Sequence, residues 1–308
     1  MRAASRLMRD VDDGLPSAVA ELRALFPHTG RAAVVGLTGA PGAGKSSLAD
    51  RLIAHWRGLG KTIGVVAVDP TSPFSGGAIL GDRIRMQEHA TDPDVFIRSL
   101  ATRGALGGLS RATADSVAIM EAMGKEIVLV ETVGVGQDEI DVAGLAHGVV
   151  VVVVPGMGDD VQAIKAGILE VADVFAVNKA DREGADRTTR ELRSMIELRG
   201  VTQAAPPPGA PEAWEPPIVQ TVATEPRGIA ELSDAIFEEL AFLDRTGRRA
   251  ERDAQRARTA FLALLRERLL STALAKLAQE QGRLDEVAGR IAARQADPWA
   301  LAAELAGG

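Results

Sequence analysis

The segment Gly39-Ala-Pro-Gly-Ala-Gly-Lys-Ser46 limits the fold of this 308-residue chain more than any other feature. It matches the pattern G-x-x-x-x-G-K-[ST] at every fixed position, and it lies between an apolar run, Ala33-Leu37, and a segment of helical spacing. Glycines in such a loop let successive backbone N–H groups converge, and the N-terminus of the following helix favours negative charge. The pattern predicts a phosphate-binding loop, with Lys45 at the β- and γ-phosphates and Ser46 on a magnesium ion. Its candidate nucleotide-binding residues are Gly39, Ala40, Pro41, Gly42, Ala43, Gly44, Lys45, Ser46 and Ser47.

Short β-branched runs alternate with stretches of helical spacing along most of the chain. This order predicts an α/β fold with a mostly parallel, doubly wound sheet. We expect N-terminal helices over 1-30, a P-loop domain over 31-245 and a helical segment over 246-308, because the last part has no strand signal. The predicted strands are Ala33-Leu37, Ile63-Val68, Ile127-Val130, Val149-Val154, Val174-Val177 and Ile218-Val222. The predicted helices between them are Ser46-Gly58, Leu106-Met123, Asp160-Glu170 and Arg182-Leu198.

Composition argues against several classes of protein. The net charge of -7 and the pI near 5.3 are unsuited to coating nucleic acid or an anionic membrane. The chain has no cysteine, which excludes disulfides and thiolate metal sites. The longest apolar run, Val149 to Val154, is far shorter than the roughly 20 residues of a membrane span. We therefore expect a cytoplasmic protein with no nucleic-acid or membrane partner.

A second motif, Asn178-Lys-Ala-Asp181, directly follows the predicted strand Val174-Val177. It matches N-K-x-D, in which the carboxylate accepts hydrogen bonds from the N1–H and 2-amino groups of guanine, and adenine offers neither. A site built on such paired polar groups rejects the wrong base strongly. Asn178, Lys179 and Asp181 are therefore the candidate base-binding residues, and the chain is predicted to prefer GTP and GDP to adenine nucleotides.

The segment Glu131-Thr-Val-Gly134 follows another predicted strand. Its position predicts that Glu131 holds Mg2+ and that the N–H of Gly134 meets the γ-phosphate. In Ras-like GTPases a water-orienting glutamine comes directly after this glycine, but here Val135 follows and the first glutamine is Gln137. The sequence therefore predicts slow hydrolysis, accelerated when a partner repositions the loop.

Two further acidic residues are candidates for the magnesium shell. Asp69 ends the predicted strand Ile63-Val68 and so faces the same edge of the sheet as the phosphate-binding loop. Asp82 lies beyond a loop rich in glycine and proline, a composition typical of segments that reorder around a γ-phosphate. For Asp82 the alternative of a helix cap stays open.

Several longer segments extend these motifs: Gly39-Ser46, Val68-Pro73, Gly76-Arg83, Phe96-Ser99, Ala101-Gly104, Leu106-Leu109 and Glu131-Gln137. Together they closely resemble the MeaB/ArgK/MMAA group of P-loop GTPases, which are chaperones of adenosylcobalamin-dependent acyl-CoA mutases. The resemblance is dense over residues 7-245 and looser over the helical C-terminus. It implies gated delivery of adenosylcobalamin to such a mutase, methylmalonyl-CoA mutase or a relative, and protection or reactivation of that enzyme.

The resemblance also implies roles for particular residues. Lys45, Ser46, Asp69, Asp82 and Glu131 would surround the phosphates and magnesium. A mobile segment, Val154 to Lys165, would link the nucleotide state to the mutase through Asp159 and Lys165. The candidate catalytic residues are Lys45, Glu131, Gln137 and Lys165.

The C-terminal helices carry an apolar stripe formed by Leu262, Leu265, Leu269 and Ala273. From the residues alone, this stripe fits packing against the chain's own core as well as it fits an arm that contacts a second copy. The resemblance favours the second interpretation and implies a homodimer.

Two other functions fit the phosphate-binding loop. A metal-insertion GTPase of the urease or hydrogenase maturation type normally carries a Cys/His motif, and here the four histidines lie in no such pattern. A small-molecule kinase would need an acceptor pocket and usually binds adenine. Both alternatives therefore rank below the mutase chaperone.

Overall fold

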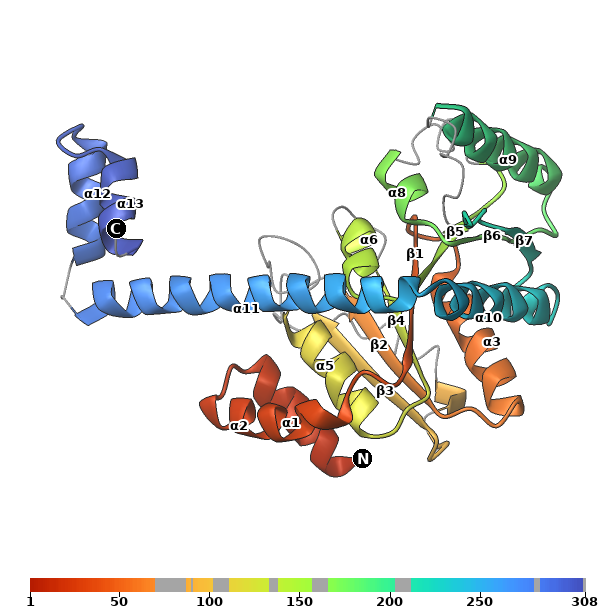
Figure 1. Ribbon diagram of the computed structural model, residues 1–308, viewed down its shortest axis with the longest axis horizontal. Helices are drawn as coiled ribbons and strands as arrows, with labels where there is room; N and C mark the ends of the chain where they lie inside the picture. The colour runs from red at the N-terminus through yellow and green to blue at the C-terminus, as the bar shows by residue number, and fades with distance from the viewer. Residues whose placement is uncertain are drawn as a thin grey trace. The chain divides into compact units, whose positions relative to one another are not determined.

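The computed structural model describes residues 1–69, 87–89, 91–101, 111–132, 138–156, 166–202, 212–279 and 283–306. Seven strands form one sheet in the order β3-β2-β4-β1-β5-β6-β7, and every neighbouring pair is parallel (Figure 1). The predicted α/β fold is therefore confirmed. The strands are β1 (Ala33–Gly39), β2 (Ile63–Asp69), β3 (Val95–Ala101), β4 (Ile127–Glu131), β5 (Gly148–Val153), β6 (Val174–Asn178) and β7 (Ile218–Thr221).

Strand β3 is the one that the sequence pattern did not predict. It lies at the edge of the sheet and pairs with β2 in register from Ile63 opposite Val95 to Asp69 opposite Ala101. An edge strand has a neighbour on one side only, so it can place polar residues such as Arg98 where a central strand would bury apolar ones. The segment consequently lacks the unbroken apolar run that located the other strands.

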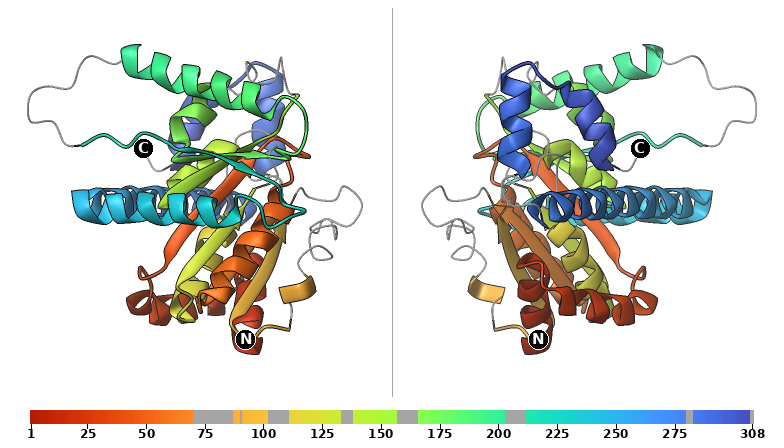
Figure 2. Two further views of the ribbon diagram at one scale, coloured as in Figure 1. Left: turned by 90° about the vertical axis from the view of Figure 1, so that its right-hand side faces the viewer. Right: turned by 90° about the vertical axis from the view of Figure 1, so that its left-hand side faces the viewer.

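Helices cover both faces of the sheet (Figure 2). The expected helices Ser46-Gly58 and Arg182-Leu198 are present with shifted ends, and the described parts of the other two are also helical. The helices are α1 (Arg2–Asp12), α2 (Pro16–Leu25), α3 (Lys45–Gly58), α5 (Arg111–Ala122), α6 (Asp138–Asp141), α8 (Ala166–Val171), α9 (Ala185–Thr202), α10 (Ile229–Thr246), α11 (Arg248–Gln279), α12 (Arg283–Ala292) and α13 (Pro298–Ala306). Short 3-10 turns lie at η1 (Phe26–His28), η2 (Gln87–His89) and η3 (Val142–Gly144).

Each buried strand contributes side chains to two hydrophobic clusters, one on each face of the sheet, because successive side chains of a strand point in opposite directions. Val35 of β1 belongs to the cluster that contains Trp56 of α3 and Leu240 of α10. Its neighbour Val34 belongs to the cluster that contains Met120 of α5. Since both faces are covered, the central strands read as continuous apolar runs.

The chain forms two compact units, Met1–Arg256 and Ala257–Gly308. In the first unit, helix α1 buries Leu7, Met8 and Val11 in the same cluster as α5. The boundary between the units lies inside helix α11, since its first two turns belong to the first unit. The functional division at residues 30 and 245 remains a prediction.

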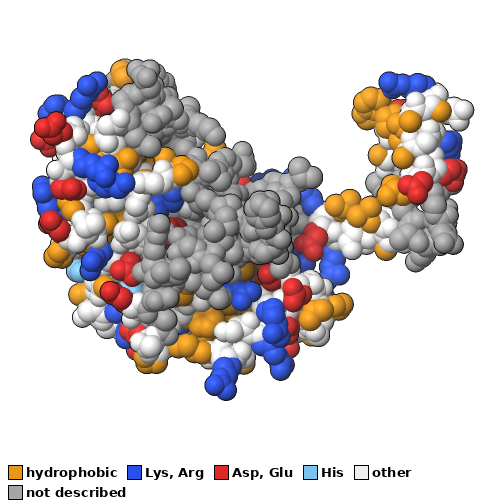
Figure 3. Space-filling view, turned by 180° about the vertical axis from the view of Figure 1, so that it is seen from behind, with side chains coloured by type: hydrophobic (Ala, Val, Ile, Leu, Met, Phe, Trp, Pro, Cys, Tyr) orange, Lys and Arg blue, Asp and Glu red, His pale blue; other side chains and the backbone are white. Residues whose placement is uncertain are grey.

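Helix α11 beyond Arg256 exposes large apolar side chains (Figure 3). The exposed fractions of Phe261, Leu269 and Leu270 are 62%, 60% and 60%. Contiguous apolar surface of this kind is typical of protein interaction sites. Among the described residues, no helix combines the length and apolar character that crossing a membrane requires.

Candidate nucleotide-binding site

The phosphate-binding loop connects the end of β1 at Gly39 to the start of α3 at Lys45. Gly39 has a φ of +138°, and a Cβ atom built on it would lie 2.1 Å from the carbonyl oxygen of Val152 in β5. Gly44 caps α3 with a φ of +88°, and a Cβ there would lie 2.5 Å from Nδ2 of Asn178. Both positions therefore require glycine, because any side chain would collide with the neighbouring strands.

Lys45 lies inside this loop, with only 6% of its surface exposed. Its Nζ donates hydrogen bonds to the carbonyl oxygens of Gly39 at 2.7 Å and Ala40 at 3.1 Å. These bonds hold a positive charge beside the N-terminus of α3, where the helix dipole also favours an anion. The arrangement is suited to binding phosphate groups.

Ser46 and Glu131 meet at the first turn of α3. The hydroxyl of Ser46 donates a 2.6 Å hydrogen bond to Oε1 of Glu131, and both residues are buried. A hydroxyl and a carboxylate are hard oxygen ligands of the kind that Mg2+ prefers, so this pair fits the predicted magnesium site. No group of three or more His, Cys, Asp or Glu side chains forms a metal cluster among the residues that the structure describes.

The N-K-x-D motif is joined directly to the phosphate-binding loop. Nδ2 of Asn178 donates to the carbonyl oxygen of Ala43 at 2.8 Å, and Nζ of Lys179 donates to that of Gly42 at 2.7 Å. Asn178 is 1% exposed, whereas Asp181 is exposed to solvent. These hydrogen bonds join the loop and the motif into one rim, in which the exposed Asp181 carboxylate remains accessible to a base.

The loop between β7 and α10 also contributes to this rim, and the sequence analysis missed it. Oδ1 of Asn178 accepts a hydrogen bond from the backbone N–H of Ala223 at 3.2 Å and from the Thr221 hydroxyl at 3.3 Å. Nε of Arg51 on α3 donates to the Ala223 carbonyl at 3.1 Å. The available signal was the end of β7, because adjacent parallel strands bring their carboxyl ends to one edge.

The predicted site residues fall into two groups. The structure brings together Gly39 to Ser47, Glu131, Asn178, Lys179 and Asp181 at the carboxyl edge of the sheet. Asp69 ends β2 at the same edge, although its side chain lies outside the described part of the chain. The other predicted residues also lie outside it; they are Asp82, Gly134, Gln137, Asp159 and Lys165.

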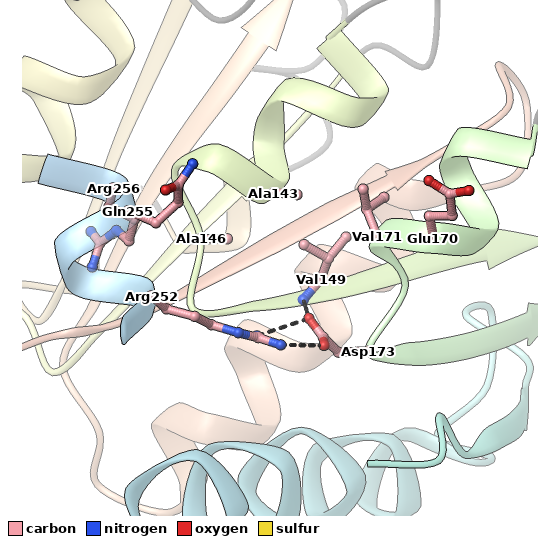
Figure 4. A pocket seen from close by; sticks show the side chains of 9 residues that line it. All are labelled: Ala143, Ala146, Val149, Glu170, Val171, Asp173, Arg252, Gln255 and Arg256. Atoms are coloured by element: carbon pink, nitrogen blue, oxygen red, sulfur yellow. Dashed lines mark hydrogen bonds and ion pairs between the residues drawn. The ribbon is translucent and has the colours of Figure 1, made fainter. Parts of the chain in front are cut away.

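A second polar cluster lies at the opposite edge of the sheet, where β5 and β6 begin (Figure 4). The guanidinium of Arg252 on α11 forms a bidentate pair with Asp173, with N–O distances of 2.7 and 3.1 Å. It also donates to Oε1 of Glu239 at 2.9 Å, while Asp173 accepts the backbone N–H of Val149 at 2.9 Å. These bonds fix the first turns of α11 to the sheet. They border a cavity of about 220 Å³.

Burial shifts the pKa values of two side chains of this cluster toward their neutral forms. Burial, followed by the nearby charge of Asp173, raises the pKa of Glu239 to about 8. Burial, followed by the charge of Arg256, lowers the pKa of His147 to about 4. Nδ1 of His147 accepts the backbone N–H of Val34 at 2.9 Å, which also requires that nitrogen to be unprotonated. His147 is therefore a buried structural residue of this cluster.

Residues 5–278 match the family described as methylmalonyl-CoA mutase-associated GTPase MeaB. The chain belongs to this GTPase family. The GTPase ArgK of Escherichia coli is 38% identical over 230 residues, which cover 74% of this chain and 67% of that protein. A GTPase candidate of Pyrococcus abyssi is 46% identical over 301 residues, covering 98% of this chain and 90% of its own length.

A mouse protein and a solved structure are also similar to this chain. The mouse mitochondrial protein described as a methylmalonic aciduria type A homolog is 38% identical over 207 residues, covering 66% of this chain and 48% of its own. The crystal structure of an LAO/AO transport system kinase superposes with a TM-score of 0.65 at 23% identity, covering 99% of this chain and 97% of that one. This structural likeness supports the fold, and the sequence matches place the protein among GTP-hydrolysing P-loop enzymes of the MeaB family.

Proposed function

We propose that this GTPase gates the delivery of adenosylcobalamin to a cobalamin-dependent acyl-CoA mutase and protects or reactivates that enzyme. The mutase would be methylmalonyl-CoA mutase or a relative. The assignment of guanine rests on the N-K-x-D motif with its Asp181 carboxylate, and its support in the structure is that Asn178 and Lys179 of this motif donate hydrogen bonds to carbonyls of the phosphate-binding loop. The mutase partner rests on the family match, whose description names a methylmalonyl-CoA mutase-associated GTPase.

The proposed chemistry divides among the residues of the rim. Lys45 stabilises the β- and γ-phosphates, and the Asp181 carboxylate accepts hydrogen bonds from the N1–H and 2-amino groups of guanine. Ser46 and Glu131 would hold Mg2+, with Asp69 and Asp82 in its shell. The ion would neutralise the charge that develops on the phosphate oxygens during transfer to water.

Partner dependence follows from the sequence after Glu131. Val135 stands where a Ras-like GTPase carries its water-orienting glutamine, and Gln137 lies two residues further on. We infer that the isolated protein hydrolyses GTP slowly and that the mutase brings Gln137, or Lys165 from the segment after β5, into place. Asp159 and Lys165 would report the nucleotide state to the mutase.

A homodimer is part of the proposal. Its support is the exposed apolar surface of α11, including Phe261, Leu269 and Leu270. Burying such side chains between two copies would contribute roughly 1.5–3 kcal/mol for each one fully covered.

The test is GTP hydrolysis measured with and without each of several candidate acyl-CoA mutases. We expect the correct mutase to raise the turnover number, and a Lys45→Ala variant to show no turnover in either condition, which excludes a contaminating GTPase. ATP in place of GTP should be hydrolysed poorly. If no adenosylcobalamin-dependent mutase accelerates the reaction, the chaperone function is refuted while the GTPase assignment stands.

The two alternative functions predict different results in the same experiments. A metal-insertion GTPase would bind nickel stoichiometrically in a titration of the purified protein. If the protein were a small-molecule kinase, ATP would displace a bound fluorescent guanine nucleotide as well as GTP does. We expect no stoichiometric nickel binding, because the chain has no cysteine and no Cys/His motif. We expect ATP to compete poorly, because the base-binding rim contains the Asp181 carboxylate.

A further inference from the structure

Two threonine hydroxyls face each other directly behind the nucleotide site, at the carboxyl ends of the neighbouring strands β1 and β4. Oγ1 of Thr132 donates to Oγ1 of Thr38 over 2.9 Å, and the two residues are 1% and 0% exposed. The backbone N–H of Thr132 also donates to the carbonyl of Leu37 at 3.1 Å. This bond extends the β1–β4 ladder one residue beyond Glu131, which is opposite Leu37.

The hydroxyl pair joins two parts of the site that are distant in the sequence. Thr38 precedes Gly39, whose carbonyl accepts the hydrogen bond from Nζ of Lys45. Thr132 follows Glu131, whose carboxylate accepts the hydrogen bond from Ser46. The pair therefore links the backbone that anchors the lysine to the backbone that carries the acid.

Packing alone does not call for hydroxyl groups at these two positions. The other strand residues beside them, such as Leu37 and Val130, are apolar and fully buried. Valine has nearly the shape of threonine, and replacing two mutually bonded polar groups by apolar ones of the same shape is close to neutral for stability. What the hydroxyl pair adds is a directional hydrogen bond, which fixes the relative position of the ends of β1 and β4.

We propose that Thr38 and Thr132 are positioning residues for GTP hydrolysis. Their hydrogen bond fixes where β4 ends relative to the phosphate-binding loop, and so it sets the position of Glu131 relative to the γ-phosphate. A displacement of about 1 Å in such a constellation can slow a reaction by roughly a hundredfold. The inference rests on the proposed GTPase site.

The pair should influence hydrolysis much more than the binding of GDP. GDP lacks the γ-phosphate, and its proposed contacts come from the backbone of the loop, Lys45 and Asp181. Lys45 is held inside the loop by the carbonyls of both Gly39 and Ala40, and these contacts remain when the Thr38–Thr132 bond is removed. A difference between the two measurements therefore separates positioning from a general role in the fold.

The main test is the double variant Thr38→Val/Thr132→Val, because it removes both hydroxyls and leaves neither unpaired. We expect single-turnover GTP hydrolysis to slow by about tenfold, while the affinity for a fluorescent GDP analogue changes by less than about twofold. Thr132→Ser should restore the rate, since it keeps the hydroxyl. Each single valine variant should be about as slow as the double, because the two residues act as one pair.

A matched control is Thr188→Val, which removes the hydroxyl of a buried threonine on α9. It should leave hydrolysis unchanged. Wild-type hydrolysis in the double variant, additive effects of the single variants, or a serine variant as slow as the valine variant would each overturn the proposal. Equal losses of hydrolysis and GDP affinity would overturn it too. A wild-type protein that does not hydrolyse GTP in the same assay would instead refute the GTPase function on which the inference rests.

Discussion

Ser46 and Glu131 lie 85 positions apart in the chain, and the hydroxyl of the first donates a 2.6 Å hydrogen bond to the carboxylate of the second. Ser46 lies in the first turn of helix α3 and Glu131 ends strand β4, so the contact depends on the β1–β4 pairing that places both at one edge of the sheet. An acid held this close to the first turn of the helix has its orientation set before any ligand binds.

Replacing Glu131 by glutamine should raise the Mg2+ requirement of the protein. The variant Glu131→Gln keeps an oxygen that can accept the Ser46 hydrogen bond, but it loses the negative charge that favours a divalent cation. We expect the Mg2+ concentration for half-maximal GTP hydrolysis to rise by about tenfold or more. Titration of single-turnover hydrolysis with Mg2+ measures this shift. An unchanged midpoint would show that Glu131 is not part of the metal site. The control is Glu126→Gln, at the residue directly before strand β4.

Replacing Asp181 by asparagine should change the preferred base. The amide of Asp181→Asn presents a donor to the guanine N1–H and 2-amino donors, so two charge-assisted hydrogen bonds are lost. At roughly 1.5 kcal/mol for each bond, GDP affinity should fall by about a hundredfold. Xanthosine diphosphate, which has a 2-oxo acceptor, should bind better to the variant than GDP does. Competition against a fluorescent nucleotide tests this, with the exposed Asp234→Asn as control; a variant that still prefers GDP would contradict the base assignment.

Removing Arg252 should destabilise the first unit of the chain. The variant Arg252→Ala leaves Asp173, which is 8% exposed, without its bidentate partner. Losing one member of a fully buried pair costs about 3–5 kcal/mol, and we expect about 2–3 kcal/mol here because the Arg252 side chain is 34% exposed. Urea unfolding gives the free energy directly. Arg258→Ala, exposed on the same helix, should change it by less than about 0.5 kcal/mol, and equal effects of the two variants would disprove the anchoring role.

Glu239 should make the stability of the protein fall as pH rises. Its pKa is raised from 4.5 to about 8, so the folded state keeps a proton that the unfolded chain releases in this interval. The stabilisation is complete below the unfolded value and is lost as pH rises through the folded value. Glu239→Gln does not titrate, so the variant should gain stability relative to wild type between about pH 5 and pH 9. Thermal unfolding at several pH values measures the difference, and parallel curves for the two proteins would contradict the prediction.

Most of the fold could be predicted because the central strands are buried on both faces. An unbroken apolar run such as Val149 to Val154, with Gly148 before it and Pro155 after it, is readily recognised as a strand. The observed strand β5 differs from this run by one residue at each end. Strand β3 was not predicted, because an edge strand tolerates polar residues such as Arg98 and so lacks an unbroken apolar run. The ion pair that joins Arg252 of α11 to Asp173 connects residues 79 positions apart, and no local pattern reveals it.

The site was predictable where backbone geometry leaves one choice of residue. Gly39 and Gly44 admit no side chain, and Lys45 and Ser46 follow them at fixed spacing, so the motif encodes the geometry. The contribution of Ala223 is made by its backbone N–H, which any residue type except proline could supply. Such a contact leaves no signature in the amino-acid sequence, and it becomes visible only when β6 and β7 are paired.

Strand β5 contacts the phosphate-binding loop at one end and the polar cluster around Glu239 at the other. At its beginning Gly148 lies against Glu239, where an added Cβ would be 2.5 Å from the carboxylate, and near its end the Val152 carbonyl lies against Gly39. A strand of six residues spans roughly 20 Å, and the hydrogen bonds to β1 and β6 keep its length constant. The strand is therefore a rigid connection between its two ends. A displacement at the phosphate-binding loop would reach the first turns of α11 as a shift or tilt of the whole strand, without any residue in between having to change its conformation.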